Sequence, residues 1–376
     1  MIRAALHPVC PRMHERSITP LSAVRPLNMT ARRAFIVGGT GQIGRAVAAE
    51  LLRRGWRVTI GARGGRSVPQ DLMQQGMEFV AVDREQPDAL ARSIGAGADA
   101  VIDTVAYDAV HARQLLAIEG DVGAFVVISS AAVYRDDNGR TLDEARETGF
   151  PELPDPITEL QPTVEPGPAT YATRKIALER TLLDEARRPV VILRPCAIHG
   201  THSHHPREWW FVKRILDRRP FVPLAHEGRS RFHTSAAANI AALAATALDH
   251  PGTRILNIAD PEAPSVMEIG ALIAAHMRYQ GQMIGLGPDA PGTVGVSPWS
   301  VPRPFILDTA AAVALGYTAR TSYRQAIGPL CDWLAGQDKE AWEAAFPVLA
   351  KYRWALFDYA SEDELELQAC ENTAIA

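Results

Sequence analysis

The chain has 376 residues, of which 47% are hydrophobic and 22% are charged, and its formal net charge is −4. This length can form two domains, or one large α/β domain with additions. The slightly negative charge gives no reason to expect a nucleic acid or an anionic membrane as a partner, and no apolar run is long enough to predict a transmembrane helix. The four cysteines lack metal-binding spacing, which favours free thiols in a reducing cytoplasm.

Residues 1–30 are expected to form a disordered extension without function. The first 33 residues contain six arginines and one glutamate, a composition that a transit peptide would share. The prolines in this segment oppose an amphipathic helix, and Met29 is an alternative start just before the first predicted strand.

Residues 34–55 have the pattern of a strand, a tight turn and a helix. The apolar run 35–37 stops at a glycine cluster, and a helical pattern follows at once. Glycines at this turn let a pyrophosphate approach the backbone, and the helix N-terminus offers free N–H groups to it. We therefore predict a dinucleotide site here. Its predicted contacts are Gly38, Thr40, Gly41, Gln42, Ile43 and Gly44.

Short apolar runs then alternate with segments of helical periodicity. The predicted strands are 35–37, 57–60, 78–82, 98–103, 124–128 and 190–193, with a further candidate at 255–258. This alternation predicts an α/β fold with a Rossmann-type doubly wound parallel sheet and a smaller C-terminal substrate-binding lobe. The dinucleotide-binding domain is placed at 31–195, with parts of 230–260, the lobe at 196–360, and a solvated acidic tail at 361–376. Predicted helices include 169–187, 205–218, 235–249, 265–279 and a final helical portion at 323–360.

Tyr171 and Lys175 lie four residues apart in the helix predicted at 169–187. This spacing places both side chains on one face of the helix. A nearby ammonium favours the phenolate, so we expect Lys175 to lower the pKa of Tyr171 toward working pH. Such a tyrosine can give or take a proton while a hydride moves on the neighbouring carbon.

In order along residues 33–260, these motifs resemble the extended short-chain dehydrogenase/reductase superfamily, in particular its NAD-dependent epimerase/dehydratase family. The resemblance implies that Ser130 binds the reacting oxygen, that Tyr171 transfers the proton, and that Lys175 holds the nicotinamide ribose. Arg194-Pro195 followed by His199-Gly200, and the block from Arg229 to His233, are similar to family segments on the substrate side. By this resemblance His199 and Arg229 would contact the substrate.

The chain departs from the family at the end of the second strand. The family has an acidic residue there that binds the adenosine ribose, whereas this chain has Ala62 followed by Arg63. A guanidinium without a carboxylate suits a 2′-phosphate, so NADP(H) is favoured over NAD(H). Asp83 and Arg84 resemble the family's adenine contacts, and the segment from Thr104 to Ala106 resembles the one that lies along the cofactor.

A cluster of histidines follows the strand at 190–193, namely His199, His202, His204 and His205. Imidazoles at this density could bind zinc or nickel, but no carboxylate or cysteine spacing accompanies them. We therefore predict no metal site and leave two readings open, a substrate-facing loop or a plain polar loop.

The most direct functional prediction is an NADP(H)-dependent oxidoreductase or epimerase with a small-molecule substrate, as the resemblance implies a sugar or a nucleotide-sugar. Ala131 and Ala132 stand where a dehydratase would carry acid/base carboxylates, which counts against dehydration. The alternative is a non-catalytic NADP-binding regulatory or interaction protein on the same fold. Dimers are common in the family, so the resemblance also admits a homodimer.

Overall fold

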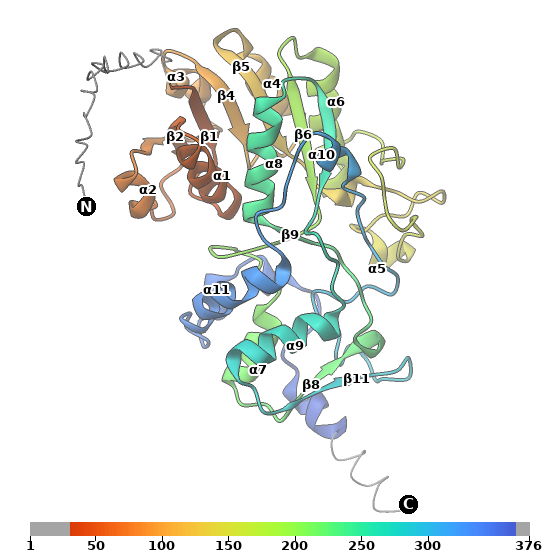
Figure 1. Cartoon of the computed structure of the whole chain (residues 1–376). Coiled ribbons are helices and arrows are strands. Elements are labelled where there is room, and N and C mark those ends of the chain that lie inside the picture. Colours follow the sequence, from red (N-terminus) through yellow and green to blue (C-terminus); the bar gives the residue numbers. More distant parts are fainter. Residues whose placement is uncertain (1–30, 366–376) are drawn as a thin grey trace, which may run out of the picture. The chain divides into compact units, whose positions relative to one another are not determined.

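A parallel sheet of seven strands, in the order β10-β6-β5-β4-β1-β2-β3, forms the centre of the fold (Figure 1). The computed structural model describes residues 31–365. The strands of this sheet are β1 (Arg33–Val37), β2 (Arg57–Ala62), β3 (Glu78–Ala81), β4 (Ala98–Asp103), β5 (Val122–Ile128), β6 (Val190–Pro195) and β10 (Arg254–Ile258).

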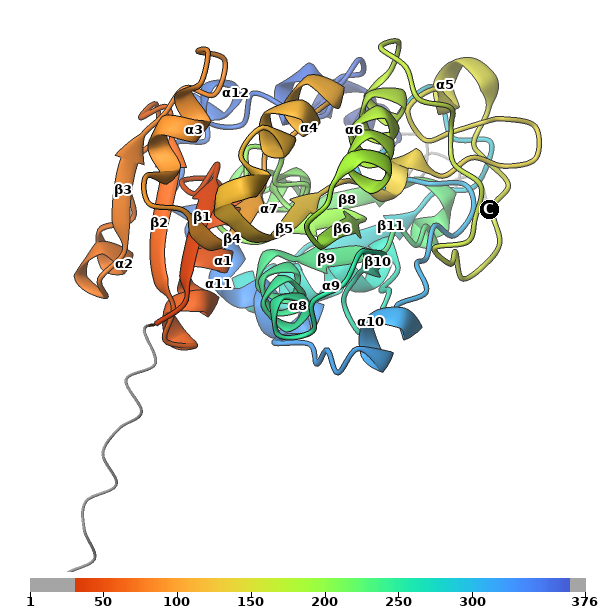
Figure 2. The ribbon, with the colours of Figure 1, turned by 90° about the horizontal axis from the view of Figure 1, so that it is seen from above.

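Helices cover both faces of the sheet, as Figure 2 shows. Side chains alternate along a strand, so Ile36 and Ile102 pack toward one face and Phe35 and Val101 toward the other. The first face is covered by α1 (Gln42–Arg53) and α8 (Ala237–Asp249), which pack on one another. The second is covered by α3 (Ala89–Ile94), α4 (Ala109–Leu116) and α6 (Tyr171–Glu185). The predicted doubly wound sheet is confirmed.

A second core, rich in aromatic side chains, gathers the C-terminal elements. Its main helices are α7 (Trp209–Leu216), α9 (Val266–Met277) and α11 (Tyr323–Ala335), and its fully buried side chains include Trp209, Trp210, Phe211 and Trp299. Two short parallel pairs belong to this half, β8 (Phe221–Leu224) with β11 (Gln282–Gly285) and β7 (Ala197–His199) with β9 (Thr234–Ala236). The remaining short helices are α2 (Gln70–Gln74), α5 (Ala145–Thr148), α10 (Ala310–Ala314), α12 (Trp342–Ala345), η1 (Glu119–Asp121), η2 (Ala131–Val133), η3 (Ala225–Gly228) and η4 (Leu349–Lys351).

The C-terminal region differs from its prediction in two respects. The helical portion expected at 323–360 is broken, because α11 ends at a Gly336 cap and only α12 and η4 follow. The acidic tail is not wholly solvated, since Glu362 is buried and its Oε1 lies 2.6 Å from Nη2 of Arg214.

The predicted N-terminal extension lies outside the described residues. Within residues 31–365, no helix combines the length and the apolar character that a membrane span requires.

Candidate active site

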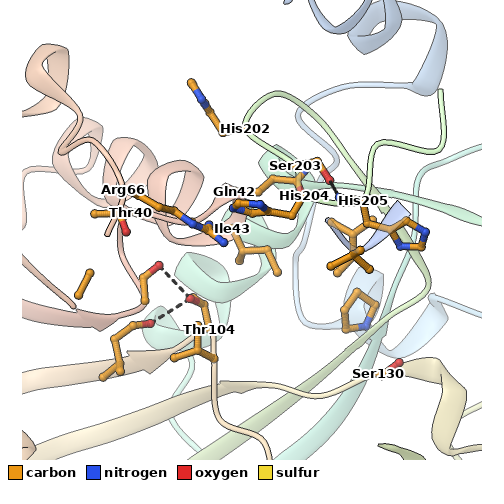
Figure 3. Close-up of a pocket in the computed structure, with 18 of the residues that line it drawn as sticks. Thr40, Gln42, Ile43, Arg66, Thr104, Ser130, His202, Ser203, His204 and His205 are labelled. Carbon is orange, nitrogen blue, oxygen red and sulfur yellow. Dashed lines mark hydrogen bonds between the residues drawn. The ribbon is translucent and has the colours of Figure 1, made fainter. Parts of the chain in front are cut away.

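A cavity of about 1130 Å³ lies where the parallel strands end at their carboxyl termini. Its walls include residues that follow five neighbouring strands, among them Gly38, Arg63, Thr104, Ser130 and Cys196. In open α/β sheets this edge is where ligands bind. Figure 3 shows part of the cavity, with the glycine turn at one end and Ser130 toward the other.

The glycine turn forms a close-fitting cradle. Gly38 has a φ of +80°, and a β-carbon on Gly44 would lie only 2.5 Å from the carbonyl oxygen of Gly38. Helix α1 therefore begins in contact with the turn, and no side chain caps its N-terminus at Gly41. Unshielded N–H groups at a helix N-terminus suit a pyrophosphate, so these residues fit a dinucleotide. Gly44 acts through packing, whereas Gly38, Thr40, Gly41, Gln42 and Ile43 line the cavity itself.

Two guanidinium groups lie beside this cradle. Arg63 and Arg66 both line the cavity from the loop after β2, and Nη1 of Arg66 lies 3.2 Å from where a β-carbon on Gly41 would stand. Burial lowers the pKa of Arg66. The positive charges of Arg45 and Arg63 lower it further, because like charges close together in one region repel one another. Such a region favours an anion. The sequence analysis missed Arg66, and the glycines before it were the one local signal of a turn.

The predicted contacts to the rest of the cofactor divide into two groups. Asp83, Arg84 and Thr104 line the cavity, but the guanidinium of Arg84 is also paired with buried Asp103, at 2.7 Å. Ala106, the other predicted contact in this segment, is fully buried and does not line the cavity. The exposed side chain of Val105 forms the wall there instead.

Ser130 and Tyr171 both line the cavity, from the segment after β5 and the start of α6 respectively. The hydroxyl of Ser130 accepts a hydrogen bond from the backbone N–H of Ala132 at 3.1 Å, which holds it at the start of η2. A capping box of Thr170 and Thr173 begins α6 and so positions Tyr171, whose side chain is 38% exposed. Loss of solvation raises the pKa of Tyr171 to about 12, and contact with Ser130 opposes part of that rise.

Lys175 lies behind Tyr171 rather than in the cavity wall. Its ammonium donates hydrogen bonds to the carbonyl oxygens of Ala106, at 2.6 Å, and Ile128, at 3.0 Å. Burial lowers the pKa of Lys175 to about 8. Its Nζ stands 5.7 Å from the centre of the Tyr171 ring. The expected lowering of the tyrosine pKa is therefore absent, because desolvation of the phenol dominates and the ammonium is turned to backbone carbonyls.

A buried polar network holds Ser129, the residue directly before Ser130. The hydroxyl of Ser129 donates to Glu179, whose other carboxylate oxygen lies 2.5 Å from Nη2 of Arg194. The guanidinium of Arg194 in turn lies 5.0 Å over the ring of Tyr134. The Arg194-Pro195 motif thus positions the end of β5 and does not contact the cavity with its charge.

Neither of the two predicted substrate contacts lines the main cavity. His199 is 1% exposed, and its Nε2 lies 2.6 Å from the carboxylate of Asp260. It faces a separate cavity of about 310 Å³. Burial would lower the pKa of His199, but the charge of Asp260 raises it overall. Arg229 is also outside the main cavity, with a 75% exposed side chain that pairs with Glu227 at 2.9 Å.

The four clustered histidines point in different directions. His202 packs against Trp333, with 5.8 Å between ring centres, and Nε2 of His205 lies 2.9 Å from the hydroxyl of Tyr352. His204 lies beside Arg66 in Figure 3, and burial together with that charge lowers its pKa. Within the described part of the chain, no three histidine, cysteine or acidic residues are grouped closely enough to hold a metal ion. His202, His204 and His205 do line the main cavity.

Four further residues line the cavity from distant segments, and the sequence analysis missed them: Asp143, Arg207, Phe232 and Tyr352. Asp143 accepts a hydrogen bond from the backbone N–H of Ala172 at 2.7 Å, so it holds the loop before α6 against the N-terminus of that helix. Phe232 lies within the predicted substrate-side block from Arg229 to His233, whereas the other three stand in no local motif that would have marked them.

Comparison with solved structures finds the same fold in several epimerases. An epimerase from Methanothermobacter thermautotrophicus superimposes with a TM-score of 0.63 at 17% identity, over 84% of this chain and 94% of that one. The UDP-glucose 4-epimerase of Thermotoga maritima, solved with UDP-glucose, gives 0.60 at 16% identity, over 80% and 98%. The UDP-glucose 4-epimerase of Thermus thermophilus, solved with NAD, gives 0.59 at 19% identity, over 81% and 100%.

Among curated proteins none matches this chain. The family model described as the NAD dependent epimerase/dehydratase family matches residues 34–259, which is more than half of the chain. That segment contains the glycine turn, Ser130, Tyr171 and Lys175. The protein therefore belongs to the NAD-dependent epimerase/dehydratase family and is an NAD(P)-dependent epimerase or oxidoreductase of the extended short-chain dehydrogenase/reductase type.

Proposed function

We propose that this enzyme uses NADP(H) for reversible hydride transfer at a carbinol or carbonyl carbon of a sugar or nucleotide-sugar. The observation that carries this proposal is that Ser130 and Tyr171 line the same cavity as the glycine cradle. The Thermotoga maritima relative, solved with UDP-glucose, supports the nucleotide-sugar class.

The chain's own residues supply binding and proton transfer. The hydroxyl groups of Ser130 and Tyr171 would hold the reacting oxygen between them, and the nicotinamide supplies or accepts the hydride when it is bound. A phenol with a pKa of about 12 keeps its proton at neutral pH. Tyr171 is therefore in the state that can protonate an oxygen as a carbonyl is reduced. Lys175 is fixed behind it by hydrogen bonds to two backbone carbonyl oxygens, which link α6 to the segments that end at Ala106 and Ile128.

The preference for NADP(H) is supported by the end of β2. No carboxylate stands at Ala62, while Arg63 and Arg66 line the cavity beyond it. A ribose 2′-phosphate would meet two guanidinium groups there, whereas the ribose hydroxyls of NAD(H) would find no carboxylate at the end of β2 itself.

Titration of NADPH and NADH, followed by fluorescence, tests this preference. We expect NADPH to bind more tightly, and Arg63→Gln and Arg66→Gln each to weaken NADPH binding by about tenfold with little effect on NADH. Arg57→Gln is the matched control, because Arg57 is exposed at the opposite end of the same strand. Tighter binding of NADH by the wild-type protein would contradict the proposal.

Changing Tyr171→Phe tests the chemistry. We expect the rate of NADPH oxidation with carbonyl substrates to fall by about 10²- to 10⁴-fold while NADPH affinity is retained, because only the transferred proton is lost. Turnover that survives this change would refute the assigned role. If a broad panel of carbonyl compounds gives no Tyr171-dependent oxidation of NADPH, the proposed hydride transfer at a carbinol or carbonyl carbon is contradicted.

A further inference from the structure

A single arginine marks the end of the cavity that lies away from the glycine cradle. Arg207 stands just before α7 and lines the cavity together with Cys196 and Phe232. Cys196 follows β6, which is separated from β1 by β4 and β5 in the sheet. This end therefore lies beyond Ser130 and is free for the substrate when the cradle holds the cofactor.

Arg207 is partly buried and, unlike the fully buried arginines, forms no ion pair with a carboxylate in the described part of the chain. Arg84, Arg194 and Arg214 each pair with a buried carboxylate. Among residues 31–365 no carboxylate lies within ion-pair distance of Arg207, and its Nε is shielded from solvent without a hydrogen-bond partner. The charge of Arg207 opposes the rise that burial causes in the pKa of Glu208, but the two groups form no direct ion pair. A partly buried cation without a direct ion pair is costly, which favours a ligand that supplies the charge.

Two aromatic rings hold the guanidinium in place. Its central carbon lies 5.4 Å from the ring centre of Phe232 and 5.5 Å from that of Trp299, which is fully buried. Packing against ring faces uses the π-electrons of the rings and leaves N–H donors of the guanidinium available for an acceptor. The group is thus positioned before a ligand arrives.

The neighbouring side chains carry no positive charge that could bind an anion in place of Arg207. Nε2 of His205 is hydrogen-bonded to the hydroxyl of Tyr352. Burial lowers the pKa of His205 to about 2, so this imidazole is neutral. Burial raises the pKa of the Cys196 thiol to about 12, so it is neutral as well. Arg207 carries the positive charge on this wall, and Tyr352 adds a hydroxyl beside it.

We propose that Arg207 binds an anionic group of the substrate, a carboxylate or a phosphate, in a subsite formed with Phe232 and Tyr352. This inference rests on the proposed function, because it assigns the substrate end of the same cavity. The planar fork of arginine matches both oxyanions. Arg229, the arginine that the family motif would assign to this task, is on the exposed surface and already paired.

Calorimetric titration of the NADP-saturated protein with three probes tests the subsite: D-glucuronate, D-glucose 6-phosphate and neutral D-glucose. We expect at least one charged probe to bind about 10- to 100-fold more tightly than glucose, and Arg207→Gln to abolish that difference. The glucuronate and phosphate arms distinguish the two anions. Arg207→Lys, which keeps the charge but not the fork, should retain part of the difference even if the glutamine variant folds poorly.

Arg229→Gln is the matched control, since it removes the same charge outside the cavity and should leave all three affinities unchanged. Equal affinities for charged and neutral probes in the wild-type protein would overturn the inference, and so would an equal loss in both glutamine variants. Binding is measured without turnover, so it can be separated from catalysis. A Tyr171→Phe variant that binds the anion normally but still turns over would refute the proposed chemistry and leave the subsite standing.

Discussion

Protonation at Tyr171 and Lys175 follows from how far the surrounding protein removes water from each group. Desolvation penalises the charged form of both groups, so it raises the pKa of the phenol and lowers that of the ammonium. The ammonium recovers part of this loss through two backbone carbonyl oxygens. Tyr171 is therefore a neutral phenol beside the cationic Lys175. A protonated phenol is what donating a proton in a reduction requires.

His199 belongs to a second buried charged pair. Its partner is the carboxylate of Asp260, and we expect the pair to stabilise the fold. Asp260 also accepts hydrogen bonds from the backbone N–H of Ala236 and the side chain of Asn239, both at 2.8 Å. Removing the imidazole leaves this carboxylate buried without its cation. We expect His199→Asn to lower the free energy of unfolding by about 3–5 kcal/mol, as measured by urea denaturation at pH 6.

The pH dependence of stability gives this prediction a sign. The folded-state pKa of His199 is raised above its unfolded value of about 6.5, so its contribution is complete below that pH and is lost as pH rises through the folded pKa. The contribution of the pair to wild-type stability should therefore fall as the pH rises above about 6.5, and His199→Asn should lack that fall. The exposed His250→Gln serves as control and should behave as wild type. A parallel pH dependence in all three proteins would show that the pair does not contribute in this way.

At the scale of elements, the cofactor site depends on how closely α1 approaches β1. A methyl group on Gly44 would meet the backbone of Gly38 and Gly39 at 2.5 and 2.6 Å, so the helix must move. We expect Gly44→Ala to destabilise the fold by about 1–3 kcal/mol and to weaken NADPH binding, because the helix N-terminus is displaced from the pyrophosphate. Thermal unfolding and NADPH titration measure the two effects. Gly120→Ala is the control, since open space surrounds that glycine, and it should change neither quantity.

The same scale explains which of the predicted site residues line the cavity. The glycine turn, Ser130 and Tyr171 follow long, strongly patterned strands or begin a regular helix, so local sequence determines their places. His199 lies on the three-residue strand β7, which is too short to recognise from its pattern. Side chains alternate along a strand, and Ile198 faces the main cavity, so His199 faces away from it.

Long-range contacts account for what the local sequence could not predict. Arg84 was expected at the adenine, and it does line the cavity, but Asp103 on another strand also holds its guanidinium. Arg207 could not be recognised because the Phe232 and Trp299 rings that hold it are distant in sequence. The motif predicted the reacting end of the site, whereas the substrate end is formed by tertiary packing.

At the scale of the whole molecule, the segment that follows α12 completes the substrate end of the cavity. Val348 and Tyr352 line the cavity, and the chain after them is tied to α7 through Arg214. The guanidinium of Arg214 lies 3.8 Å over the ring of Trp210, donates to the carbonyl oxygen of Leu356 at 2.8 Å, and pairs with Glu362. The buried ion pair thus connects the C-terminal segment to the lobe that carries Arg207.

Neutralising Glu362 should therefore affect the substrate end of the cavity and leave the cofactor end unchanged. Glu362→Gln leaves a buried guanidinium without its counter-ion, which we expect to cost about 3–5 kcal/mol of stability. Hydrogen exchange should become faster across 349–362, while residues 34–60 and NADPH affinity stay as in wild type, because the glycine cradle has no contact with this ion pair. Glu340→Gln, at a side chain that is 81% exposed, is the matched control and should change neither. Equal acceleration of exchange in both regions would mean that the C-terminal segment supports the whole fold instead of the substrate end alone.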